Sequence, residues 1–199
     1  MSFNTYQSIG MVAKELQIFY TEANFIIEQE LEIKVFFREE LEWVLAKGVV
    51  RNSEAAICEN LIYPLLKEVW KHYAEQLVVW SHQALHYDEN LSGVPDYIIA
   101  KRSVLGKVVF DSPYLVVVAA KKDNFEAGWG QCLAELMAVQ KINQLPEQVV
   151  YGIVSNGDYW EFGQLKQSVF TKNIKVYTLQ TLDSLMAALN YIFMQVTQL

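Results

Sequence analysis

The sequence has few residues of the kinds that build cross-links or metal centres. It holds two cysteines, Cys58 and Cys132, and neither belongs to a CxxC motif or a cysteine–histidine pair, so nothing supports a disulfide or a zinc site. The three histidines, His72, His82 and His86, lack the spacing that puts two metal ligands on one helix face. We therefore expect two buried free thiols and three surface or partly buried histidines.

Long apolar runs and targeting signals are also absent. The longest apolar run, residues 114–120, is about a third of the ~20 residues that a membrane-spanning helix needs. The first ten residues have neither the basic start nor the apolar stretch of a signal peptide. These absences predict a cytoplasmic protein with no membrane partner.

Nucleotide-binding and serine-nucleophile motifs are missing as well. Neither GxxxxGK[ST] nor GxGxxG occurs, and no serine stands in a recognisable context of histidine and acid. The chain also lacks internal repeats, low-complexity segments and Gly/Ser linkers. With 199 residues and 52% hydrophobic content, it is long and apolar enough for one domain with a substantial core.

The net charge of −7 argues against a protein that binds nucleic acid over its whole surface. Residues 1–96 carry 7 basic and 15 acidic side chains, whereas residues 97–199 carry 9 and 8. Between positions 97 and 122 the only acid is Asp111, and there are five basic residues: Lys101, Arg102, Lys107, Lys121 and Lys122. These residues can form a local basic surface, or they can be ordinary solvated residues of loops and strand ends.

The first part of the chain reads as helical. Residues 1–50 combine a glutamate-rich face with an apolar face, and Gly48 is a suitable helix end. A second helix is expected to start after Asn52 or Ser53 and to run towards residue 72, where Pro64 kinks or divides it. Within that helix Glu59 shares an apolar stripe, where a carboxylate needs a partner.

Strands dominate the next part. Residues 77–87 and 94–100 are strand-like, residues 108–110 can begin a third strand, and residues 115–121 continue it. The continuous apolar character of residues 115–120 predicts a strand covered on both faces.

The last third of the chain predicts a helix, a hairpin and a final helix. The first helix should follow Asp123-Asn124 and span residues 125–143, before Pro146. Asn156-Gly157 between two β runs predicts a hairpin, and a further β stretch around residues 169–179 leads to a helix over 182–196. This order predicts an α/β protein with a mixed sheet flanked by helices.

One set of polar residues suggests a metal-dependent hydrolase. Metal-assisted hydrolysis of a phosphodiester needs carboxylates that hold the ion and a group that positions the attacking water. Asp96 on one strand and Lys121 at the end of the next are such groups. Side chains two residues apart on a strand share a face, so an acid at position 119 would lie beside Lys121.

The order and context of four elements resemble the PD-(D/E)XK nuclease-like superfamily, with the nuclease domain of type I restriction endonucleases as the nearest likeness. The elements are Glu59 in a helix, Pro95-Asp96, Lys121, and Gln131 in the following helix, and the resemblance covers residues 53–163. It implies a restriction-endonuclease-like fold over residues 51–199, with residues 1–50 as a helical N-terminal extension packed on that core.

The resemblance also implies roles. Asp96 and Glu59 would be ligands of Mg²⁺ or Mn²⁺, Lys121 would position or activate water, and Gln131 would steady the site. The superfamily expects Asp or Glu at position 119, where this chain has Ala119. Asp123 could replace that acid only if the chain turned back after Lys121. We therefore expect weak metal binding.

Three functions follow from these expectations. The first is an impaired Mg²⁺-dependent nuclease acting on DNA. The second is a catalytically inactive protein of the same fold that binds nucleic acid or a protein partner, and the acidic net charge favours a protein. The third is a homodimeric module joined through residues 1–50.

Overall fold

The computed structural model describes residues 3–198. Its helices and strands are η1 (Phe3–Thr5), α1 (Ile9–Leu16), β1 (Phe19–Ala23), α2 (Val35–Lys47), α3 (Glu54–Ile57), the π-helical turn η2 (Cys58–Ile62), α4 (Tyr63–Trp70), β2 (Leu77–Ser81), β3 (Leu85–His86), β4 (Ser92–Gly93), β5 (Tyr97–Lys101), β6 (Tyr114–Ala120), α5 (Phe125–Asn143), β7 (Val150–Ser155), β8 (Tyr159–Lys166), β9 (Val169–Asn173), β10 (Tyr177–Thr178), η3 (Leu179–Thr181) and α6 (Leu182–Thr197).

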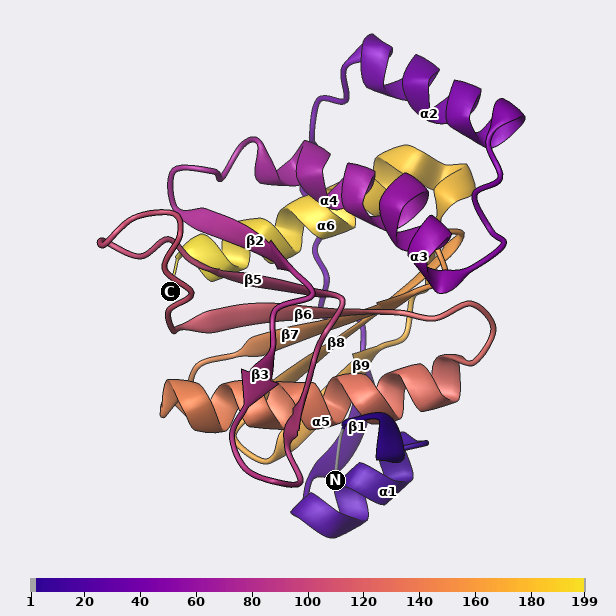
Figure 1. The fold of residues 1–199 in the computed structure, drawn as a ribbon. Coiled ribbons are helices and arrows are strands. Elements are labelled where there is room, and N and C mark those ends of the chain that lie inside the picture. The colour runs from indigo at the N-terminus through magenta and orange to yellow at the C-terminus, as the bar shows by residue number, and fades with distance from the viewer. Residues whose placement is uncertain (1–2, 199) are drawn as a thin grey trace.

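A mixed sheet between two layers of helices forms the centre of the fold, which confirms the predicted α/β class (Figure 1). The strand order is β1-β9-β8-β7-β6-β5-β2, and β10 pairs with β8. The pairs β1/β9 and β6/β7 are parallel, and the other pairs of this sheet are antiparallel. β3 and β4 form a separate two-stranded sheet.

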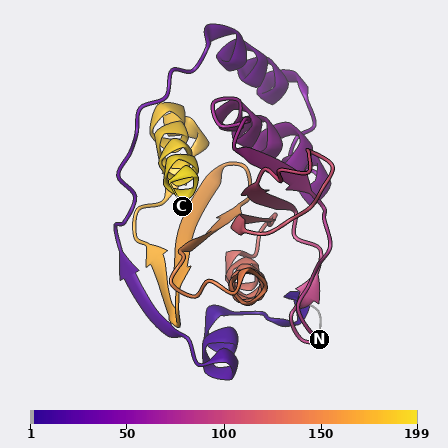
Figure 2. The ribbon, with the colours of Figure 1, turned by 90° about the vertical axis from the view of Figure 1, so that its left-hand side faces the viewer.

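The two faces of the sheet are both covered. Helices α4 and α6 cover one face, with α2 outside them, and α5 covers the other together with α1 (Figures 1 and 2). All seven residues of β6 are buried, and alternate ones contribute to the two cores: Val116 and Val118 to one, Val117 and Ala119 to the other. This confirms the expected double coverage of that strand.

Several local predictions are confirmed. Helix α5 occupies residues 125–143, and β7 and β8 form an antiparallel hairpin around Gly157, whose φ of +86° suits glycine. The side chain of Asn156 accepts hydrogen bonds from the N–H groups of Asp158 and Tyr159 and so fixes the turn. Both cysteines are buried free thiols.

The pattern of residues 1–50 predicted a helical segment, and this prediction is wrong for part of it. Residues 19–23 form β1, an exposed edge strand that pairs with β9 from Phe19↔Val169 to Ala23↔Asn173 (Figure 2). The short aromatic and β-branched run Phe19-Tyr20-Thr21 suits a strand, but its partner lies about 150 residues away in the sequence, beyond the reach of local patterning.

The strand predictions were too long at three places. β2 stops at Ser81 because His82 takes a left-handed conformation with φ 51°, and the chain then forms β3 in the smaller sheet. β5 begins at Tyr97 rather than at residue 94. Residues 108–110 form no strand.

The helix after Ser53 is divided, as Pro64 suggested. The Ser53 hydroxyl accepts a hydrogen bond from the Ala56 N–H and caps α3, and the wider π-helical turn η2 separates α3 from α4. Pro64 lies in the first turn of α4, where a missing N–H group is tolerated. No helix within residues 3–198 has the length and apolarity needed to cross a bilayer.

Candidate functional site

Three strand ends meet beside the N-terminal ends of α3 and α5, on the right-hand side of Figure 1. The register pairs Ser81 with Tyr97, and Tyr97 with Val118. One residue further towards this edge, His82, Asp96 and Ala119 therefore stand in one row across β2, β5 and β6. In this row Ala119 stands between Asp96 on β5 and Val154 on β7, so no second carboxylate stands next to Asp96 on β6.

Asp96 is held by the backbone of β6. Its Oδ2 accepts a hydrogen bond of 2.7 Å from the Ala120 N–H, and its Oδ1 faces His82 Nε2 at 3.8 Å and Cys58 Sγ at 4.0 Å. Burial raises the pKa of Asp96, while the Ala120 N–H and the charges of Lys121 and His82 act in the opposite direction. One carboxylate oxygen is therefore fixed and the other is turned towards polar groups.

Lys121 follows β6 directly and lies between the two helix layers. Its N–H donates to the Ser155 carbonyl at 2.9 Å, and its Nζ lies 4.0 Å from Glu54 Oε1 at the start of α3. A side chain at Gly128 in α5 would collide with the Lys121 stem at 2.8 Å, so this glycine makes room for the lysine. Asp96, Lys121 and Glu54 form what we call the strand-edge cluster.

Helix α5 adds a buried carboxyl that the sequence analysis missed. Glu135 is fully buried, its Oε1 accepts a hydrogen bond of 2.8 Å from Gln131 Nε2, and its Oε2 has no partner among the described residues. Burial raises the pKa of Glu135 to about 8, and the negative charge of Asp96 adds to the rise, whereas Gln131 and Lys121 oppose it. The spacing of four residues after Gln131 could have indicated that Glu135 shares its helix face.

The elevated pKa of Glu135 predicts a pH-dependent stability. The folded chain keeps a proton on Glu135 between the ordinary glutamate pKa and about 8, whereas the unfolded chain loses it, so the stabilising effect of low pH disappears as pH rises through that window. The free energy of unfolding of the wild-type chain should therefore fall between pH 5 and 8. In Glu135→Gln this fall should be smaller by more than ~1 kcal/mol. Urea unfolding at several pH values measures it.

The exposed Glu126 in the first turn of the same helix gives the control. Glu126→Gln should leave the pH slope of the wild-type chain unchanged. Equal slopes in the Glu135→Gln variant and the wild type would show that Glu135 does not carry the buried proton.

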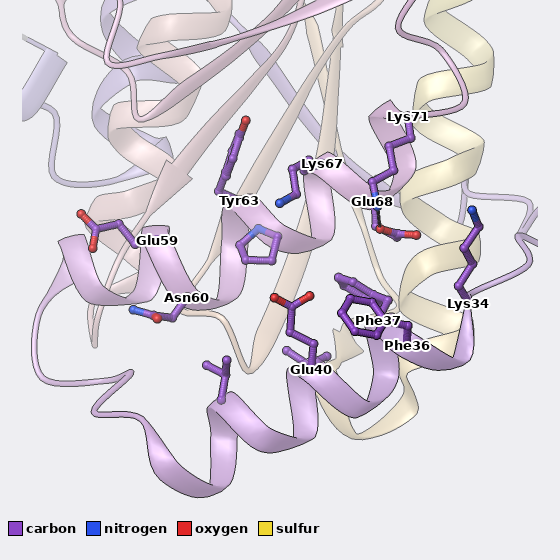
Figure 3. Close-up of a pocket in the computed structure, with 13 residues that line it drawn as sticks. Lys34, Phe36, Phe37, Glu40, Glu59, Asn60, Tyr63, Lys67, Glu68 and Lys71 are labelled. Atoms are coloured by element: carbon purple, nitrogen blue, oxygen red, sulfur yellow. Dashed lines mark hydrogen bonds and ion pairs between the residues drawn. The ribbon is translucent and has the colours of Figure 1, made fainter.

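Glu59, the predicted helix-borne acid, lies in the π-helical turn η2. Its side chain is exposed, and Glu54 is the carboxylate of this helical segment that reaches Lys121. Glu59 lines a cavity of about 310 Å³ between α2 and the η2–α4 segment, and Figure 3 shows it directed away from Phe37 and Glu40, which rise from α2 into that space. The structure thus brings Asp96 and Lys121 together, with Gln131 one helix turn from Glu135, while Glu59 also lines a second cavity, of about 410 Å³, with His82 and Tyr97.

A divalent ion would find one well-placed carboxylate oxygen here. Within residues 3–198, no group of three or more His, Cys, Asp and Glu side chains is arranged to hold a metal ion. Asp96 Oδ1 can still bind an ion that keeps most of its water, as Mg²⁺ commonly does. The arrangement therefore fits a weakly held, largely hydrated ion.

The strand-edge cluster carries charged groups of both signs. It combines a carboxylate, an ammonium group and a second acid within reach of solvent, since the side chains of Asp96 and Lys121 are 22% and 20% exposed. No protein-family model and no curated protein sequence matches this chain.

Proposed function

We propose that this chain is a nuclease-like protein of the PD-(D/E)XK kind, with a restriction-endonuclease-like arrangement of its sheet, that hydrolyses DNA phosphodiesters slowly with Mg²⁺ or Mn²⁺. The observation that carries the proposal is the meeting of Asp96 and Lys121 at adjacent strand ends, next to the buried Ala119. The aspartate can hold the ion and the lysine can position water, and the second carboxylate that this chemistry usually uses is absent at Ala119.

The residues take distinct roles in this proposal. Asp96 would hold the ion through Oδ1, because Oδ2 accepts the hydrogen bond from the Ala120 N–H. The ion, when bound, neutralises charge on the phosphate and lowers the pKa of a bound water. Lys121 positions the attacking water or the phosphate, and Glu54 keeps the ammonium group near the strand end. Gln131 steadies the neighbouring carboxyl of Glu135.

Asp96→Asn tests the proposal with purified protein and supercoiled plasmid DNA. We expect slow nicking by the wild-type chain in Mg²⁺ or Mn²⁺, its loss on addition of EDTA, and a reduction of at least ~10-fold in Asp96→Asn, because the amide is a poor metal ligand. Asp111→Asn, an exposed acid in the β5–β6 loop, should nick like the wild type. Nicking that survives in Asp96→Asn would place the activity elsewhere or in a contaminant.

A second function is favoured by the missing acid itself. Ala119 is fully buried and supplies no ligand, so the same fold can serve as a catalytically inactive module that binds a protein or a nucleic acid. The net charge of −7 favours a protein partner. Salt-dependent DNA binding without nicking would support the nucleic-acid form of this function, since phosphate contacts give a steep salt dependence.

A further inference from the structure

His82 lies beside Asp96 in the row of strand ends and takes no part in the function proposed above. Its backbone N–H donates a hydrogen bond of 2.9 Å to the Asp96 carbonyl, and its φ of 51° is a left-handed conformation that side chains other than glycine seldom adopt. This conformation ends β2 and turns the imidazole towards the carboxylate. The fold thus aims an imidazole at Asp96 Oδ1, which also accepts a long hydrogen bond of 4.0 Å from Cys58 Sγ.

The separation of the two side chains suits a bridging ion. His82 Nε2 and Asp96 Oδ1 are 3.8 Å apart, which is too long for a hydrogen bond. Two metal–ligand bonds of about 2.1 Å each span about 3.0 Å at the octahedral angle and about 3.4 Å at the tetrahedral one, so a small rotation of the exposed imidazole would let one ion bind both atoms. The second oxygen of Asp96 is already held by the Ala120 N–H, which fixes the carboxylate in this orientation.

The imidazole is also held from its other side. Ser81 Oγ lies 2.8 Å from His82 Nδ1 and can accept a hydrogen bond from Nδ1–H, which leaves the Nε2 lone pair free to bind an ion. The ring stands edge-on to Tyr97 with the ring centroids 6.1 Å apart. The position of Nε2 is therefore set by a hydrogen bond and a ring contact.

Solvent and further ligands can reach this place. The His82 side chain is 59% exposed and, with Ser81 and Tyr97, lines a cavity of about 410 Å³ that can hold the waters of a partly hydrated ion. The positive charge of Lys121 opposes a cation here, but Glu54 lies 4.0 Å from that ammonium group and offsets it.

We infer that His82 and Asp96 form a two-residue site for a divalent transition-metal ion, with the remaining positions filled by water. The ion class follows from the donors: imidazole nitrogen favours ions such as Co²⁺, Ni²⁺ and Zn²⁺, and Mn²⁺ accepts it more readily than Mg²⁺, which prefers oxygen. The inference rests on the proposed function in one respect, the use of Asp96 as a metal ligand. It adds a preference for transition-metal ions, which a site made of carboxylates alone would not have.

Mn²⁺ binding to the metal-free chain, measured by calorimetry, tests the site without any nuclease assay. We expect Mn²⁺ to bind at least ~10-fold more tightly than Mg²⁺. The informative variant is His82→Asn, because asparagine tolerates the left-handed conformation and keeps the fold, while it removes the imidazole. His82→Asn should weaken Mn²⁺ binding at least ~10-fold. His86→Asn, at an exposed histidine of β3, should bind like the wild type.

Electron spin echo spectroscopy of the Mn²⁺-loaded chain gives a second readout. The ¹⁴N modulation of one bound imidazole should be present in the wild type and in His86→Asn, and absent in His82→Asn. Absence of Mn²⁺ binding, or the same modulation in all three proteins, would overturn the inference. Imidazole-bound Mn²⁺ without DNA nicking would support the His82–Asp96 site and contradict the hydrolytic function. Nicking without the ¹⁴N signal would support the hydrolytic function and contradict the site.

Discussion

An Ala119→Glu variant is expected to bind Mg²⁺ at least ~10-fold more tightly than the unsubstituted chain and to nick plasmid DNA roughly 100-fold faster. The new carboxylate would stand in the row of strand ends next to Asp96 and on the same face as Lys121. Two carboxylates then share one ion, which is the usual protein contribution to a Mg²⁺ site. Calorimetry and a plasmid-nicking assay measure the two effects.

Ala119→Gln is the matched control, because glutamine has the same shape without the charge. Position 119 is fully buried, so both variants carry the same risk of overfilling the core, and circular dichroism shows whether each is folded. Without metal, the glutamate variant should be the less stable of the two, since it places a third acid near Asp96 and Glu135. Added Mg²⁺ should close that gap.

Equal Mg²⁺ affinities in Ala119→Glu and Ala119→Gln would contradict the geometry of the strand-edge cluster. If both longer side chains prevent folding, Ala119→Asp and Ala119→Asn repeat the comparison with a shorter side chain. Tighter metal binding without faster nicking would instead favour the binding module, because the metal site would then be repaired while the substrate was still not cleaved.

The elements that the sequence predicted are those set by local chemistry. Helix α5 begins after a capping Asn124, whose side chain accepts a hydrogen bond from the Ala127 N–H, and the β7–β8 turn follows from Asn156-Gly157. The burial of β6 on both faces follows from its uninterrupted apolar residues. Each of these depends on neighbours in the sequence, which the pattern contains.

The features that the sequence did not predict depend on contacts between distant residues or on a backbone conformation that is unusual for the residue type. β1 exists because residues 169–173 offer a strand edge, and β2 ends because His82, not a glycine, adopts φ 51°. For the candidate site, the expected pairing of neighbouring strands placed Asp96 near Lys121. The resemblance pointed to Glu59 as the helix-borne acid, whereas the capped start of α3 brings Glu54 to the lysine. Helix phase after a π-helical turn cannot be read from apolar spacing, because η2 shifts it.

Gly130 in α5 carries the second large effect, on stability rather than activity. Gly128 in the same helix lets α5 approach the sheet, because an added Cβ there would meet Lys121 and Val154. Gly130 instead faces the N-terminal segment: an added Cβ would lie 2.5 Å from the Ser8 N and 2.6 Å from the Tyr6 carbonyl oxygen. Backbone atoms cannot move aside as a flexible side chain can.

We expect Gly130→Ala to lower the free energy of unfolding by about 2 kcal/mol, because the steric cost of overfilling exceeds the gain of up to ~1 kcal/mol that alanine brings to a helix. Gly10→Ala in α1 is the control: its nearest neighbour would be Ser8 Oγ at 3.8 Å, an ordinary contact, so that variant should be as stable as the wild type or slightly more. Urea denaturation measures both. Equal stability of Gly130→Ala and Gly10→Ala would contradict the close packing of the backbone of residues 6–8 against α5.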